Sequence, residues 1–241
     1  MAQYVYGKNV VKQLILDQKK IHQLILSKET PWKEGEELAA TYKIQVIYAD
    51  KKQINTYAEG NHQGVIAKVD DFKTYSLDEV VKSAQNNGLF VMLDGLEDPH
   101  NLGAILRSAD ASGVDGIILP KRRSVGLTPV VAKVSTGAID TVKTAEVTNL
   151  TASLKELKKA GYWVVGASST PKSVDYRSVD YTGKIVLVVG SEGFGLSRLV
   201  EENCDFIVHL PMLGKVTSLN ASVATGILLY EVLNQRYPFK K

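Results

Sequence analysis

Three short stretches of the 241-residue sequence carry polar side chains at spacings that suit ligand binding. The first runs from Asp94 to Ala109 and reads DGLEDPHNLGAILRSA. Asn101 stands where a helix N-cap is expected, directly before an apolar stripe with helical spacing, and Arg107 lies off that stripe. A fixed cation beside a helix N-terminus is a good arrangement for binding phosphate. A capping asparagine and an unrelated surface arginine would give the same spacing, so both interpretations stay open.

The second stretch is a glycine-rich loop, GSEGFGL, from Gly190 to Leu196. Its order, G-x-x-G-x-G, differs from the dinucleotide fingerprint, and no Gly-Lys-Ser/Thr follows as it would in a P-loop. Glycines let the backbone approach a ligand closely, and the single carboxylate of Glu192 suits a cationic or hydroxyl-bearing ligand better than a pyrophosphate. An ordinary strand-to-helix turn is the alternative.

The third stretch reads LPMLGKVTSLNASVA from Leu210 to Ala224. Either Ser218 or Asn220 is expected to cap a final helix, whose apolar stripe begins at Leu219. Small polar side chains at a helix N-terminus can hydrogen-bond a ligand, and they can equally form a redundant cap.

The elements that would position these stretches form an α/β pattern from Leu89 onward. Short apolar runs alternate with helical segments, which predicts a parallel sheet covered on both faces. The expected strands are Leu89–Leu93, Gly116–Leu119, Trp163–Ala167, Ile185–Val189 and Phe206–Leu210, and the expected helices include Leu150–Ala160 and Leu219–Leu233. Each polar stretch follows one of these strands, and parallel sheets bind ligands at the carboxyl ends of their strands.

The first part of the chain reads as a smaller mixed domain. Val10, Leu14 and Ile15 have helical spacing, and the segments Lys43–Tyr48 and Val65–Val69 are strand-like. We therefore expect a small domain over residues 1–72, a polar linker over 73–88 and a second domain over 89–241.

Composition sets further limits on the protein. The apolar fraction of 44% and charged fraction of 23% suit a globular protein, and the net charge of +3 means that nucleic acid must be bound by local patches. Lys121–Arg123 is one such patch, although a solvated charge run is equally consistent. The four histidines lack metal-ligand spacing, and Cys204 is the single cysteine. Because neither a signal-peptide core nor an apolar run of about 18 residues is evident, we expect a cytoplasmic protein without metal or membrane association.

Taken together and in this order, the three stretches closely resemble the motifs of the SpoU (TrmH) family of RNA ribose 2′-O-methyltransferases. The matching words are NLGAILRSA, GSEGFGL and LPMLGKVTSLNASVA, and the likeness spans about residues 89 to 236. A weaker likeness links the segment YGKNVV, residues 6–11, to the L30e-like substrate-binding domain that many members carry. The whole chain is similar to the subgroup that methylates a guanosine of 23S ribosomal RNA.

The resemblance implies a SPOUT methyltransferase domain with a C-terminal trefoil knot, a feature that the sequence pattern alone does not predict. It also implies a homodimer that acts on RNA and binds S-adenosyl-L-methionine (AdoMet), largely through backbone groups. The cofactor contacts implied are Gly190, Gly195, Leu210, Met212 and Leu219. The active-site residues implied are Asn101, Arg107, Glu192, Ser218 and Asn220.

The role of Arg107 is the open chemical question. A guanidinium gives up its proton only with great difficulty, which argues against Arg107 as the base that deprotonates the ribose hydroxyl. We favour a clamp on the target phosphate that also stabilises the developing alkoxide, with Glu192 as a positioning acceptor or an alternative base. Asn101 is expected to orient Arg107 or the ribose.

Three other functions fit the same residues. The enzyme could methylate a guanosine of transfer RNA, or it could be a resistance methyltransferase acting on another ribosomal nucleotide. An RNA-binding factor that has lost catalysis is the third alternative, and the complete set of motif residues argues against it.

Overall fold

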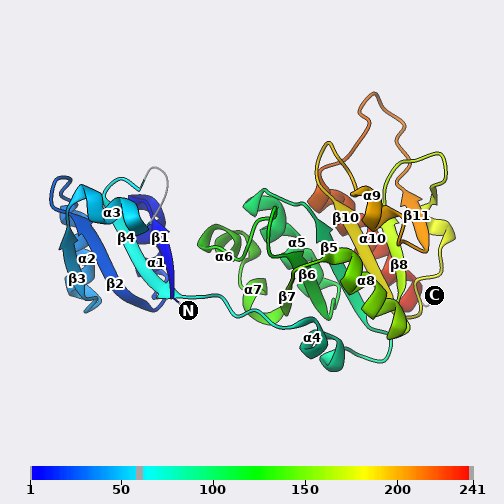
Figure 1. Cartoon of the computed structure of the whole chain (residues 1–241), viewed down its shortest axis with the longest axis horizontal. Coiled ribbons are helices and arrows are strands. Elements are labelled where there is room, and N and C mark those ends of the chain that lie inside the picture. Colours follow the sequence, from blue (N-terminus) through cyan, green and yellow to red (C-terminus); the bar gives the residue numbers. More distant parts are fainter. Residues whose placement is uncertain (1, 58–61, 239–241) are drawn as a thin grey trace. The chain divides into compact units, whose positions relative to one another are not determined.

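The computed structural model describes residues 2–57 and 62–238, and the chain divides into two compact units, Met1–Phe72 and Lys73–Lys241 (Figure 1). None of the helices in these described ranges has the length and apolar character needed to cross a membrane.

Unit 1 contains a four-stranded sheet with strand order β1-β4-β2-β3. Strand β4 is antiparallel to both β1 and β2, while β3 is parallel to β2. The strands are β1 (Ala2–Tyr6), β2 (Ile21–Ser27), β3 (Val46–Ala49) and β4 (Val65–Asp70), and the helices are α1 (Lys8–Leu16), α2 (Lys33–Thr41) and α3 (Lys51–Tyr57). Buried side chains of α1 and α2 share one apolar cluster, and Ile54 of α3 packs in a second cluster with Ile25 and Ile66. The sheet is therefore covered on both faces.

Unit 2 is built on a seven-stranded sheet in which every strand pair is parallel. Its order is β7-β6-β5-β10-β8-β11-β9, so β10 lies between two strands that precede it in the chain. The strands are β5 (Leu89–Asp94), β6 (Gly116–Pro120), β7 (Thr144–Val147), β8 (Trp163–Ala167), β9 (Val174–Asp175), β10 (Ile185–Gly190) and β11 (Phe206–His209). The predicted parallel α/β sheet is confirmed, and the two strands that the sequence did not predict, β7 and β9, are short.

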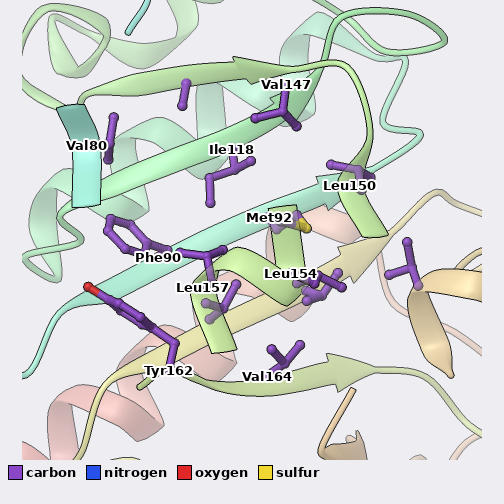
Figure 2. Packing of buried hydrophobic residues seen from close by; sticks show 14 of the residues in the cluster. Val80, Phe90, Met92, Ile118, Val147, Leu150, Leu154, Leu157, Tyr162 and Val164 are labelled. Atoms are coloured by element: carbon purple, nitrogen blue, oxygen red, sulfur yellow. The ribbon is translucent and has the colours of Figure 1, made fainter. Parts of the chain in front are cut away.

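Helices cover both faces of this sheet. They are α4 (Leu77–Ser83), α5 (Pro99–Ala111), α6 (Pro129–Ser135), α7 (Ala138–Thr141), α8 (Leu150–Lys159), α9 (Arg198–Glu201) and α10 (Ala221–Arg236), with a 3-10 turn at Tyr176–Ser178. On one face, Phe90 and Met92 of β5 share a buried cluster with Leu157 of α8 (Figure 2). Because strand side chains alternate, Val91 and Leu187 point to the opposite face. There α10 packs beside β10 and against α5.

The start of α5 differs from the prediction. The helix begins at Pro99, and its N-cap is Asp98, whose side chain accepts a hydrogen bond of 2.9 Å from the backbone N–H of His100. Asp is a strong N-cap and Pro is pre-organised for the first helical position, so this pair outcompetes Asn101. Asn101 instead lies inside the first turn of α5, where its side chain is only 6% exposed.

The segment 73–88, expected to be a polar linker, carries α4. Ser76 and Glu79 form a capping box at the start of this helix, and Val80 is completely buried in the core of unit 2 (Figure 2). The sequence signal was present, since Ser-x-x-Glu before an apolar residue is the capping-box pattern. Because many charged residues surround Val80 in the sequence, the segment was predicted to be exposed and the burial of this valine was missed.

Cys204 lies in a tight contact between α9 and the sheet. A Cβ atom at Gly166 of β8 would lie only 2.7 Å from its sulfur, so the glycine makes room for the thiol. Burial raises the pKa of the Cys204 thiol to about 12. The side chain therefore stays protonated and acts as a small apolar filler.

We expect Cys204 to resist a thiol reagent such as Ellman's reagent in the folded protein at about pH 8, because only the thiolate reacts. After denaturation in guanidinium, one thiol per chain should be titrated at the rate of a free cysteine. Stopped-flow absorbance measures both rates. Equal rates in the folded and denatured protein would contradict the partly buried, protonated thiol.

Candidate active site

The three polar stretches meet at the carboxyl edge of the unit 2 sheet. The second and third stretches line a cavity of 410 Å³ between the ends of β8, β10 and β11 and the start of α10. All five residues predicted to contact a cofactor line it, namely Gly190, Gly195, Leu210, Met212 and Leu219. A cavity of this size falls within the range of about 300–1,000 Å³ that is typical of small-molecule sites.

The glycine loop is folded tightly against the end of β10. Ser191 and Gly195 exchange two backbone hydrogen bonds of 3.2 and 3.0 Å. Gly195 and Gly193 adopt left-handed backbone angles, with φ of 65° and 89°. A Cβ atom at Gly190 would lie 2.1 Å from the carbonyl carbon and oxygen of Gly195. Only glycine at position 190 allows this closure, which brings the loop backbone to the cavity wall.

The carboxylate of Glu192 gathers hydrogen bonds from the other two stretches. Its Oε1 accepts from Asn101 Nδ2 at 2.9 Å, from Asn220 Nδ2 at 2.7 Å and from the backbone N–H of Ala221 at 3.3 Å. Asn220 Nδ2 also donates to Asn101 Oδ1 at 2.8 Å. These three donors fix the orientation of the carboxylate, while Oε2 has no hydrogen-bond partner among residues 2–57 and 62–238.

Asn220 has two functions at once. Its Oδ1 caps α10 by accepting from the backbone N–H groups of Ser222 and Val223 at 2.9 and 3.3 Å, while its Nδ2 serves the network around Glu192. The sequence left the cap of this helix open between Ser218 and Asn220, and the structure assigns it to Asn220. The N-terminal end of α10 also brings its positive dipole end to the carboxylate.

The remaining two predicted catalytic residues lie outside the network. Ser218 lines the cavity with an exposed side chain. Arg107 is exposed on α5 and makes no hydrogen bond or ion pair with the described part of the chain. The structure therefore joins Asn101, Glu192 and Asn220, places Ser218 on the cavity wall and leaves Arg107 open to solvent.

His209 is a cavity residue that the sequence did not single out. Its Nδ1 lies 3.0 Å from Ser173 Oγ, and that hydroxyl donates its hydrogen to the carbonyl of Thr170 at 2.7 Å. Ser173 must then accept from His209, so the Nδ1 atom carries the proton. Its position as the last residue of β11, at the carboxyl edge of the sheet, was the available signal. Within the described ranges, no cluster of three or more His, Cys, Asp or Glu side chains could hold a metal ion.

Comparison with known proteins identifies this arrangement. Residues 88–230 match the SpoU rRNA Methylase family. The chain belongs to this family. Residues 4–75 match a second family, described as RNA 2′-O ribose methyltransferase substrate binding.

Individual relatives agree with this membership in the SpoU family. The chain is 46% identical over 241 residues to the Bacillus subtilis protein named as TrmH family tRNA/rRNA methyltransferase YacO, covering 98% of this chain and 96% of the relative. The solved structure of an AdoMet-bound rRNA methyltransferase from Sinorhizobium meliloti is 28% identical, with a TM-score of 0.64, covering 99% of this chain and 88% of that one. The A. aeolicus TrmH/SpoU tRNA modifying enzyme is 37% identical with a TM-score of 0.57, covering 66% and 80%.

This SpoU family protein is thus an AdoMet-dependent RNA 2′-O-ribose methyltransferase. The size of the cavity fits such a cofactor. A Cβ atom at Gly190 would collide with the backbone of the glycine loop on the cavity wall. Most of the residues that line the cavity are uncharged, Glu192 and His209 being the ionisable ones, which suits a ligand held largely through main-chain groups.

We expect Gly190→Ala to weaken AdoMet binding about tenfold or more, because the new methyl group would push the Gly195 backbone away from the strand end. Gly183→Ala, two residues before the start of the same strand, is the control, since nothing lies within 4 Å of a Cβ atom there. Isothermal titration calorimetry measures both. An unchanged affinity in Gly190→Ala would contradict the tight loop.

We expect Asn220→Asp to lower the rate of methyl transfer more than about tenfold while α10 stays capped, because Asp caps helices well. The substitution replaces a donor at 2.7 Å from Glu192 by a second carboxylate, and like charges at that distance repel. Asn220→Ser removes the donor without adding charge and should lose less activity. Circular dichroism checks the helix, and a wild-type rate in Asn220→Asp would show that the network is dispensable.

Proposed function

We propose that this enzyme methylates the ribose 2′-hydroxyl of a guanosine in 23S ribosomal RNA. The share of this chain that each relative matches supports ribosomal RNA over transfer RNA as the substrate. The S. meliloti rRNA methyltransferase aligns with 99% of this chain, whereas the A. aeolicus tRNA modifying enzyme leaves about a third of it unmatched. A separate RNA-binding domain suits a large structured RNA. The choice of guanosine rests on the likeness of the three motifs to that subgroup.

We assign cofactor binding to Gly190, Gly195, Leu210, Met212 and Leu219, which surround the cavity. When bound, AdoMet supplies a methyl group already activated by its sulfonium charge. The protein must then hold the ribose oxygen in line with that methyl group, and such alignment alone can supply much of the acceleration.

Glu192 and its network face the ribose in this proposal. Because Asn101 and Asn220 occupy Oε1, the free Oε2 is available to accept a hydrogen bond from the substrate hydroxyl. Asn101 then acts by holding Glu192 and not by orienting Arg107. Ser218, on the cavity wall, offers a hydroxyl to the same space.

Arg107 serves as the cation for the target phosphate. Its exposed guanidinium has no competing carboxylate among the described residues, so a phosphate can take both donors of its fork. A cation held there also stabilises negative charge that develops on the attacking oxygen.

The basic run Lys121–Arg123 extends this RNA-binding surface. The backbone carbonyl of Leu96 accepts from Ser124 Oγ at 3.1 Å and from the Val125 N–H at 2.7 Å, which ties the loop after β6 to the stretch that precedes α5. All three basic side chains are exposed. These cations follow β6 at the same carboxyl edge of the sheet as the cavity, where they are available for contact with RNA phosphates.

We further propose a trefoil knot in the C-terminal part of unit 2, an L30e-like fold for unit 1, a homodimer and a cytoplasmic location. Insertion of β10 between β5 and β8 supports a chain path that crosses itself. The dimer is supported by an apolar face on α5 and α10, where Val223 and Tyr230 are 50% and 55% exposed beside a shallow depression that Ala104 and Ile227 also line.

We expect a strain that lacks the enzyme to lose one 2′-O-methyl mark in 23S ribosomal RNA, detected as a missing reverse-transcription stop at low nucleotide concentration. The wild-type gene and an Arg198→Ala control, which alters an exposed arginine on α9, should restore the mark. Arg107→Ala should not restore it, although its AdoMet affinity should stay near the wild-type value. A mark lost from transfer RNA instead would favour transfer RNA as the substrate. The 37% identity to the A. aeolicus tRNA modifying enzyme is the observation that supports this alternative.

A further inference from the structure

Phe194 stands at the exposed end of the glycine loop. Its side chain is 93% exposed, far above what is usual for a phenylalanine, and it has no aromatic neighbour among the described residues. A single exposed apolar side chain is ordinary on a protein surface. Phe194 differs from an ordinary exposed residue in two respects. The loop backbone that carries it is closed by hydrogen bonds, and it lies beside the active site.

Hydrogen bonds close the backbone of the loop that carries Phe194. Gly193 and Gly195 flank it on both sides in left-handed conformations, and the two hydrogen bonds between Ser191 and Gly195 close the loop beneath it. The ring is thus carried by an ordered backbone, so little further ordering is needed when a partner binds.

Phe194 also adjoins the reaction centre. It lies two residues after Glu192, whose carboxylate is fixed by Asn101 and Asn220, and it lines the rim of the cavity. RNA that brings a ribose to Glu192 must pass this rim. An exposed ring at that place is available to the bases next to the reacting sugar.

We propose that Phe194 is a positioning residue on which a base of the RNA stacks next to the target ribose. The inference rests on the proposed function and adds a contact to it. Proteins that bind unpaired RNA commonly stack bases on aromatic side chains, and such stacking tolerates any base. Phe194 therefore holds the strand in register, while the choice of nucleotide must come from other contacts.

Two other roles fit the structure less well. A lid over the cofactor would need the ring against the cavity, but almost the whole side chain faces solvent. A contact between subunits would be expected on the apolar face of α5 and α10, and Phe194 does not line the depression there.

The test compares four variants on ribosomal RNA for KM, kcat, the dissociation constants of RNA and AdoMet, and the sedimentation coefficient. Phe194→Ala should raise both KM and the dissociation constant for RNA about tenfold, with a smaller change in kcat and AdoMet affinity within about twofold. Phe194→Trp should restore both RNA constants, and Phe194→Leu, which keeps apolar volume without a ring face, should not. Trp163→Ala is the matched control, because it removes a 55% exposed aromatic ring from the start of β8, at the opposite edge of the sheet.

Unchanged RNA constants in Phe194→Ala, or full activity in Phe194→Leu, would overturn the stacking role. Loss of AdoMet affinity would identify a lid, and a changed sedimentation coefficient would identify a subunit contact; either result also overturns it. Failure of the wild-type enzyme to methylate ribosomal RNA would contradict the proposed function instead. The same variants would then be compared on transfer RNA, where equal dissociation constants would again refute stacking.

Discussion

One carboxylate oxygen ties the catalytic unit together. Glu192 Oε1 accepts three hydrogen bonds, and its donors come from the start of α5 and the start of α10. The residues involved are separated by as many as 119 positions in the sequence, yet their amides form a closed set in which each donor has an acceptor. Such networks lose more than the sum of single bonds when one member is removed, because a polar group is left without a partner. The position of the first turn of each helix and that of the glycine loop thus depend on one another.

The sheet makes this convergence possible. Because all its strand pairs are parallel, the ends of β5, β10 and β11 lie on one edge, and the three segments that follow them are brought together without long connections. Gly190 then removes the side chain that would keep the loop away from the strand end. The same packing rule operates in the core, where Gly166 admits the Cys204 sulfur. Absence of a Cβ atom is in both places what allows two segments to touch.

Local patterns in the sequence predicted the parts of this arrangement that depend on neighbouring residues. Trp163–Ala167 and Ile185–Val189 are short apolar runs, and both form interior strands of the unit 2 sheet. The strand order could not be predicted in this way, because nothing in β10 itself specifies that it pairs with β5. The prediction of Asn101 as the N-cap is wrong for a related reason: its spacing fits a cap, but Asp98 and Pro99 compete for the same helix start. The hydrogen bonds among Asn101, Glu192 and Asn220 depend on the tertiary structure, and no local sequence pattern predicts them.

The position of α4 bears on how the two units can be separated or recombined. Tyr75 pairs with β7 through its backbone N–H, which donates to the carbonyl of Thr144 at 2.9 Å, and Val80 fills the core beneath the sheet. A catalytic unit excised at residue 88 would therefore lose an edge contact and leave a hole beside Phe90. The natural joint for exchanging RNA-binding domains within this family lies earlier, between β4 and Tyr75, where the chain passes from one core to the other. Chimeras joined there would exchange the substrate-binding domain and leave the core of unit 2 intact.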